Sequence, residues 1–268
     1  MILNIHDFNL EATLESGQVF GFEKVESGVY EGFISKAFLR IRQHHGLEIE
    51  SSGITEREII HFFHLDFDLT PVYELLSEDP RLRLIAQRFK GLRIIRQNFW
   101  EALACFIISA NNNIKRIQKI RRNLVSTFSG SSREFPSFDQ IASSSEEKLR
   151  ALGLGYRAPY LWKTANIVAA NPNILSDIQN LSYDGAKEKL LEFPGVGKKV
   201  ADCVLLFGIQ KYEAFPVDTW ILKAMRKLYF RNRKVAEQKI QKFGQQRWKQ
   251  HAGYIQQYLF HAAKSGIV

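Results

Sequence analysis

The spacing of apolar residues changes along the chain at about residue 55. The first fifty residues predict strands, most clearly VFGFEKVESGVYEGFISKAFLRIRQHHGLEIES at 19–51, where short apolar runs are broken by Ser27-Gly28 and Gly46. This pattern is typical of hairpins in an antiparallel sheet. From Thr55 onward, apolar residues recur at helical spacing in segments such as EREIIHFFHLDFDLTPVYELL, so helices are predicted there.

The rest of the chain is predicted to be helical almost throughout. An apolar helix and a basic amphipathic helix within 98–128 are separated by the polar break Asn111-Asn112-Asn113. A loop is expected at Gly130-Ser131-Ser132, and Ser145 is expected to cap the helix EEKLRAL. The fold class is therefore α+β, with a small N-terminal antiparallel β-sheet domain with flanking helices at 1–95 and a larger all-helical domain at 96–268.

Composition and charge narrow the class of protein. The 268 residues are 45% hydrophobic and 24% charged, which is ordinary for a globular protein, but the net charge is +9. An excess of cations suits a polyanionic partner, nucleic acid above all. No apolar run approaches the ~20 residues of a membrane span, and the N-terminus has no signal-peptide pattern.

The two cysteines, Cys105 and Cys203, lie in apolar helical patterns. A disulfide framework is therefore not expected, and a reducing compartment fits best. Two cysteines also cannot by themselves ligate an iron–sulfur cluster, so no metal site is predicted.

A Pro-Gly-x-Gly turn at 194–197 connects two predicted helices in EKLLEFPGVGKKVADCVLLFGI. Gly195 and Gly197 permit close approach of the backbone to a ligand. The free N–H groups at the start of the second helix form an anion site that a DNA phosphate would suit. A plain helical turn packed in a core explains the pattern equally well.

Helical phase separates the two lysines that follow this turn. Lys199 and Cys203 are four residues apart and share a face, whereas Lys198 shares a face with Asp202. We expect Lys198 to form an ion pair with Asp202 at the surface. Burial disfavours a charged ammonium and a nucleophilic amine must be neutral, so Lys199 is the candidate nucleophile.

Asp218 precedes a helical pattern in EAFPVDTWILKAM, where an aspartate most often serves as an N-cap. Capping by helix N–H groups would also keep the carboxylate ionised and aimed at a developing cation. About twenty residues separate it from Lys199, so both side chains can reach one cleft.

Together, PGVGKKVAD and PVD resemble the helix–hairpin–helix Gly-Pro-Asp DNA glycosylase superfamily. Further stretches are similar to the 8-oxoguanine DNA glycosylase/lyase family: SGQVF at 16–20, FIISANNNIKRI at 106–117, LGLGYRAPY at 152–160, KVADC at 199–203 and AGYIQQYLF at 252–260. These motifs span residues 14–260 in the family's order, so the larger region is expected to be a helix–hairpin–helix glycosylase domain.

The resemblance implies roles for individual residues. The family lysine at the position of Lys199 attacks C1′ of the damaged nucleotide and forms an imine that allows β-elimination, while the aspartate at Asp218 supports the reaction electrostatically. The extruded base is held between Cys203 and Phe260, its Watson–Crick edge is read by Gln256, and its N7–H donates to the carbonyl of Gly17. Without the resemblance, Phe260 and Gly17 would be taken as core and turn residues.

The resemblance also implies contacts with the opposite strand. Asn111, Arg116 and Arg157 match residues that contact the orphaned cytosine, and Tyr156 matches a residue that wedges into the gap. Trp220 stands where vertebrate relatives have a histidine near the phosphate, as in the shorter bacterial versions of the family, so a strict demand for cytosine opposite the lesion does not follow from the resemblance.

The leading hypothesis is a bifunctional glycosylase/lyase that acts without cofactor, as a monomer, on double-stranded DNA containing 8-oxoguanine. The expected compartment is the bacterial cytoplasm with its nucleoid, or the nucleus in a eukaryote. Alternatives are a related glycosylase for alkylated or other oxidised bases, or a non-catalytic DNA-binding protein. Lys199 argues against a monofunctional alkylation enzyme, and the +9 charge suits all of these hypotheses.

Overall fold

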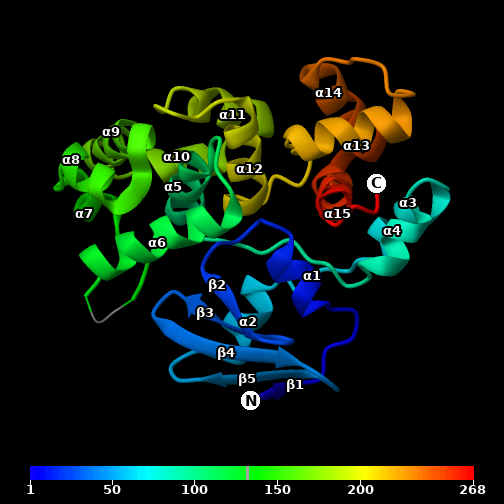
Figure 1. Ribbon diagram of the computed structural model, residues 1–268, viewed down its shortest axis with the longest axis horizontal. Coiled ribbons are helices and arrows are strands. Elements are labelled where there is room, and N and C mark those ends of the chain that lie inside the picture. Colours follow the sequence, from blue (N-terminus) through cyan, green and yellow to red (C-terminus); the bar gives the residue numbers. More distant parts are fainter. Residues whose placement is uncertain (131–132) are drawn as a thin grey trace.

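The computed structural model, which describes residues 1–130 and 133–268, places a twisted sheet beneath a larger set of helices (Figure 1). The five antiparallel strands lie in the order β1-β5-β4-β3-β2. They are β1 Ile2–Leu3, β2 Phe22–Glu26, β3 Val29–Ile34, β4 Ala37–Gln43 and β5 Leu47–Ser51. The expected α+β fold is confirmed.

One face of the sheet is apolar because alternate strand residues point to the same side. Tyr30 pairs with Ile41, which pairs with Ile49, and all three are buried. The helices α1 (Leu10–Glu15) and α2 (Glu56–Phe62) contribute to the same hydrophobic core. The helix α1 corrects the expectation of strands throughout the first fifty residues; the Asn9 side chain caps it by accepting from the Ala12 N–H at 2.8 Å.

The helical region has α5 and α12 packed at its centre. Nearly every residue of both helices is buried, as in an apolar helix surrounded by others. The helices from residue 99 onward are α5 Phe99–Ser109, α6 Ile114–Phe128, α7 Phe138–Ala142, α8 Glu146–Leu149, the π-helical turn η1 Arg150–Leu154, the 3-10 turn η2 Gly155–Arg157, α9 Ala158–Ala170, α10 Ile174–Asn180, α11 Tyr183–Leu191, α12 Lys198–Gly208, α13 Thr219–Tyr229, α14 Glu237–Trp248, the 3-10 turn η3 Lys249–His251 and α15 Ala252–Lys264.

The short helices α3 (Thr70–Glu78) and α4 (Arg83–Arg88) lie beside α15, far along the chain (Figure 1). Val72, Leu76 and Ile85 are buried in the core of the helical region rather than in the core of the sheet. A boundary at residue 95 stays a prediction, and these two helices, although N-terminal to it, pack with the helical region.

Two capping predictions are confirmed. Ser145 accepts a hydrogen bond from the Lys148 N–H, and Asp218 accepts one from the Ile221 N–H. The loop expected at Gly130-Ser131-Ser132 lies largely outside the described residues. Within the described part of the chain, no helix is long and apolar enough to cross a membrane.

Candidate active site

The Pro-Gly-x-Gly turn forms a tight hairpin between α11 and α12. Gly195 has a φ of +80°, and a Cβ at this position would lie 2.7 Å from the Cβ of Tyr160, so no larger residue fits. The Thr164 hydroxyl donates to the Pro194 carbonyl at 3.2 Å and holds the turn against α9. Gly197 is the N-cap of α12 and has open space around it, which leaves the first N–H groups of α12 available to an anion.

The two lysines after the hairpin have different surroundings, as their helical phase predicts. Lys198 is exposed, whereas Lys199 is half-buried with its Nζ 5.4 Å from the centre of the Phe106 ring. Cys203 is buried and its thiol contacts the amine of Lys199. Burial raises the pKa of Cys203 to about 11, against the opposite effect of Lys199, so the thiol is protonated at neutral pH.

The expected ion pair between Lys198 and Asp202 is wrong. Asp202 points into the protein and accepts hydrogen bonds from Lys187 Nζ at 2.8 Å, from the Tyr183 hydroxyl at 2.6 Å, and from the Gln241 amide. Lys198 has no ion-pair partner within the described residues. Asp202 is buried beside Lys187 of α11 and Gln241 of α14, and the phase of α12 alone does not reveal these partners.

Asp218 is half-buried at the N-terminus of α13, where its Oδ1 accepts the Ile221 N–H at 2.8 Å. Its charge, like that of Lys199, acts on the Cys203 thiol, so the three side chains lie in one neighbourhood. Lys199 and Val217 also line a common hollow of about 500 Å³ between α12, α13 and α14. Lys199 and Asp218 are therefore both neighbours of the Cys203 thiol, and their joint role in catalysis stays a prediction.

Two of the residues expected to hold the base, Gly17 and Phe260, come from opposite ends of the chain and lie together. Gly17, with a φ of +72°, lies against α15: a Cβ there would be 3.0 Å from Phe260 Cε1 and 3.3 Å from Ile114 Cδ1. Gln257, which the sequence analysis missed, donates from Nε2 to the Ser16 carbonyl at 2.8 Å and fixes this contact. Gln257 follows Gln256 directly in the sequence, but nothing in the motif distinguishes a glutamine with this contact from an ordinary core residue.

Gln256 is buried and only half satisfied. Its Nε2 donates to the carbonyl of Pro216 at 3.1 Å, and Pro216 precedes Asp218 by two residues. Its Oε1 has no hydrogen-bond partner among the described residues. A buried acceptor without a donor is costly, and it is a feature expected of a group that awaits a ligand.

The residues expected at the opposite strand form a second cluster beside α5. Arg157 is 2% exposed and donates from Nε to the Ala110 carbonyl at 2.7 Å and from Nη2 to the Asn111 carbonyl at 2.7 Å. Tyr156 is 48% exposed, and its hydroxyl donates to the same Ala110 carbonyl at 3.1 Å. Arg116 is exposed on α6. Arg157 thus holds the Asn111 turn in this structure, and its contact with a base stays a prediction.

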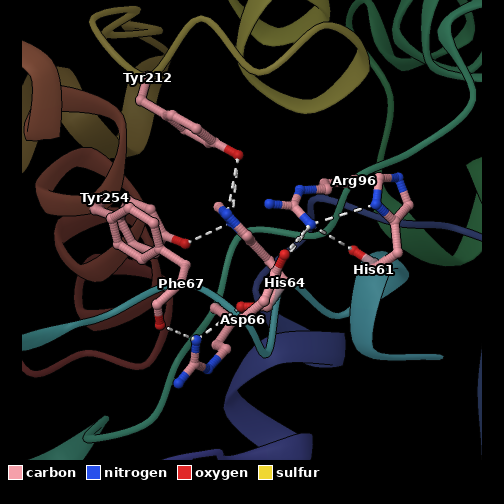
Figure 2. Close-up of polar contacts among 8 residues, drawn as sticks. His61, His64, Asp66, Phe67, Arg96, Tyr212 and Tyr254 are labelled. Atoms are coloured by element: carbon pink, nitrogen blue, oxygen red, sulfur yellow. Dashed lines mark hydrogen bonds and ion pairs between the residues drawn. The ribbon is translucent and has the colours of Figure 1, made fainter. Parts of the chain in front are cut away.

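A buried histidine ties α15 to the N-terminal part of the chain (Figure 2). His64, with a φ of +55°, lies with Nδ1 2.9 Å from the Tyr254 hydroxyl and 3.2 Å from the Tyr212 hydroxyl. Burial and the charge of Arg96 lower the pKa of His64 to about 3, so the ring is neutral. Arg96 in turn pairs with Asp66 at 2.9 Å. No local pattern in the sequence predicts this cluster, which holds the helix that carries Gln256 and Phe260.

Comparisons with known proteins match both parts of the chain to families of DNA repair proteins. Residues 1–103 match the 8-oxoguanine DNA glycosylase N-terminal domain, and residues 104–250 match the HhH-GPD superfamily base excision DNA repair proteins. A probable N-glycosylase/DNA lyase of Methanothermobacter thermautotrophicus is 33% identical over 310 residues, which cover 100% of this chain and 97% of the relative. The N-glycosylase/DNA lyase OGG1 of Arabidopsis thaliana is 30% identical over 95% of this chain and 77% of its own.

Solved structures extend the similarity to three dimensions. The 8-oxoguanine glycosylase/lyase of Clostridium acetobutylicum, in complex with double-stranded DNA containing cytosine opposite 8-oxoguanine, is 33% identical with a TM-score of 0.91. The match covers 100% of this chain and 99% of that one. A 3-methyladenine DNA glycosylase of Archaeoglobus fulgidus, 21% identical with a TM-score of 0.79, shares the fold. This chain therefore belongs to the 8-oxoguanine DNA glycosylase family within the HhH-GPD superfamily of base excision DNA repair proteins.

Proposed function

We propose that this enzyme excises 8-oxoguanine from double-stranded DNA and then cleaves the strand, with Lys199 as the nucleophile. The observation that carries the assignment is the position of Lys199, half-buried against the Cys203 thiol and the Phe106 ring, near the capped carboxylate of Asp218. These contacts hold the amine in one position beside the carboxylate, and an amine acts as a nucleophile in its neutral form.

The reaction follows from these two side chains. The Lys199 amine forms a bond to C1′ as the glycosidic bond breaks, and the base leaves after taking up a proton. Loss of the proton from nitrogen and cleavage of the C1′–O4′ bond, with O4′ taking up a proton, give an imine. β-Elimination then removes a proton from C2′, forms the C2′–C3′ double bond and breaks the C3′–O bond of the strand. Asp218, whose Oδ1 accepts the Ile221 N–H, stabilises the positive charge that develops on the sugar.

Recognition of the base is assigned to Gly17, Gln256 and Phe260. The unpaired Oε1 of Gln256 is a buried acceptor, which suits the N1–H and N2–H donors of a guanine edge. The Gly17 carbonyl would accept N7–H, which 8-oxoguanine has and guanine lacks. Phe260 lies against Gly17, so a base stacked on its ring would be within reach of both contacts.

The DNA contacts are assigned to the hairpin and to the cluster beside α5. The open N-terminus of α12 at Gly197 suits a phosphate of the damaged strand. Tyr156, which is exposed, is placed to enter the gap left by the extruded base. Such an enzyme works where the DNA is, in the bacterial nucleoid or in a nucleus.

The test is a set of duplexes that differ in one base. We expect base release and strand cleavage with 8-oxoguanine opposite cytosine, and at least tenfold slower release of 3-methyladenine or an oxidised pyrimidine. Faster release of an alkylated base would favour the related glycosylase, and binding without release from any duplex would favour the non-catalytic alternative.

A further inference from the structure

We infer that the buried cluster of Tyr183, Lys187, Asp202 and Gln241 positions the nucleophilic lysine and sets the charge balance beside it. The inference rests on the proposed function, because it takes Lys199 as the nucleophile. The four residues lie outside the groups assigned to the base or the DNA, so they form a separate set of positioning residues.

The cluster is buried, and both oxygens of its carboxylate accept hydrogen bonds. The Asp202 side chain is 1% exposed; Oδ1 accepts from the Tyr183 hydroxyl at 2.6 Å and from Lys187 Nζ at 2.8 Å, and Oδ2 accepts from Lys187 Nζ at 3.0 Å and from Gln241. Lys187 also donates to the Tyr183 oxygen at 2.9 Å, which leaves the tyrosine proton for Asp202. Burial raises the pKa of the Asp202 carboxyl, whereas the hydrogen bonds and charge of Lys187, Tyr183 and Gln241 oppose that rise by stabilising the carboxylate.

The position of the cluster connects it to both catalytic elements. Asp202 lies on α12 one turn after Lys199 and next to Cys203, and it is held by α11 on one side and α14 on the other. Gln241 also donates to the Phe215 carbonyl at 3.3 Å, three residues before Asp218. One carboxylate therefore fixes the helix that presents the amine and, through Gln241, the segment that leads to the catalytic carboxylate.

A buried ion pair is a weak source of stability because both charges lose their hydration. A pair of apolar residues would hold three helices together at least as well. An ion pair next to an amine can affect the protonation of that amine, which apolar residues cannot do. The intact pair has almost no net charge, but its anion and its cation would act on Lys199 with opposite signs.

The charged groups near the amine come from α11, α12, α13 and its N-cap, and α14. Lys198 on α12, Arg226 on α13 and Glu237 on α14 border the same hollow of about 500 Å³ as Lys199 and Asp202. Asp218 lies near the Cys203 thiol, and Lys187 and Tyr183 reach Asp202 from α11. Removing one end of the pair leaves the other end uncompensated: a free Lys187 cation disfavours the ammonium of Lys199, and a free Asp202 anion favours it.

The experiment measures the single-turnover rate of 8-oxoguanine release against pH, with enzyme in saturating excess. Asp202→Asn should move the pH midpoint of the rate to lower pH and Lys187→Gln should move it to higher pH, each by roughly half to one unit. The double variant should return close to the wild-type midpoint. Lys189→Gln is the matched control, since it removes an exposed, surface-paired cation from the same helix and should leave the midpoint in place.

If the cluster only stabilises the fold, the pH midpoint should not change. Both single variants would then lose rate and melt at lower temperature with no change in midpoint, and that result would overturn the inference. If Asp202→Asn does not fold, Lys187→Gln and the double variant decide the matter. Release of 8-oxoguanine by the wild type tests the proposed function separately. The pH dependence of reductive methylation of Lys199, measured by mass spectrometry, tests the same shifts in the variants without DNA.

Discussion

Lys198 and Lys199 are adjacent and chemically identical, yet the helix that begins with them gives them different chemistry. Lys199 lies over the Phe106 ring and against the buried Cys203 thiol, whereas Lys198 is exposed beside the hairpin. Because Asp202 is occupied by Lys187, Lys198 is left free for a phosphate. A single step of 100° around α12 thus separates an exposed lysine from a half-buried one that contacts a thiol and an aromatic ring.

The two roles of Asp218 can be separated by substitution. Asparagine keeps a side-chain oxygen for the Ile221 N–H, so Asp218→Asn should leave the free energy of unfolding within a few tenths of a kcal/mol of wild type. Asp218→Ala should lower it by about 1 kcal/mol through loss of the cap. Both should slow base release by about a hundredfold, because both remove the charge. Thermal unfolding and single-turnover kinetics measure the two effects, and full activity of Asp218→Asn would contradict the electrostatic role.

At the scale of elements, the hairpin between α11 and α12 depends on the fit of its glycine against α9. Gly195 combines a φ of +80° with a distance of 2.7 Å between a built Cβ and the Cβ of Tyr160. The turn therefore cannot accept a side chain without moving away from α9, and a moved turn would displace the first residues of α12, including Lys199.

This fit predicts a difference between two glycines. Gly195→Ala should lower the free energy of unfolding by about 1–3 kcal/mol and weaken DNA binding, since it adds a clash to an unfavourable φ. Gly28→Ala is the control, because Gly28 has a φ of +73° but open space around it, so it should cost about 1 kcal/mol and leave DNA binding unchanged. Chemical denaturation and a binding titration check both, and equal effects of the two changes would contradict this account of the hairpin.

Local patterns predict the elements well and their partners poorly. Alternation predicts the sheet, helical phase distinguishes Lys199 from Lys198, and a polar residue before an apolar run predicts the cap at Asp218. The partner of Asp202 could not be predicted, because Lys187 and Gln241 lie 15 and 39 residues away on other helices. The burial of Arg157 was missed for the same reason: it depends on carbonyls of a turn that is 46 residues distant.

At the scale of the whole molecule, a net charge of +9 implies binding governed by phosphate contacts. Each phosphate neutralised releases counterions, so the logarithm of the association constant should fall by about 0.9 per tenfold rise in salt for each contact. Titration of an 8-oxoguanine duplex between low and moderate salt should therefore show a steep loss of affinity. An affinity that does not change over this range would contradict the role of the basic surface.

The buried histidines make the stability of the fold depend on pH. Burial lowers the pKa of His64 to about 3 and of His261 to about 4, below the ordinary value of 6.5 in the unfolded chain. The unfolded chain therefore binds more protons below pH 6.5, and the free energy of unfolding should fall as the pH drops from 6.5 towards 4, by about 1.4 kcal/mol per unit for each ring.

Denaturation at several pH values tests this dependence. His261→Gln should reduce the slope between pH 6 and pH 4.5, whereas His45→Gln, which changes an exposed ring, should leave it as in the wild type. A wild-type stability that stays constant from pH 6.5 to pH 4.5 would show that neither ring is held neutral by burial.

The most direct test of the central claim is borohydride trapping on a duplex with 8-oxoguanine opposite cytosine. Borohydride reduces the imine between enzyme and DNA to a stable covalent bond. The wild type and Lys198→Gln should both give the adduct, the latter with weaker DNA binding, and Lys199→Gln should give none. Loss of the adduct in Lys198→Gln at saturating enzyme, with the adduct retained in Lys199→Gln, would contradict the assignment of Lys199 as the nucleophile.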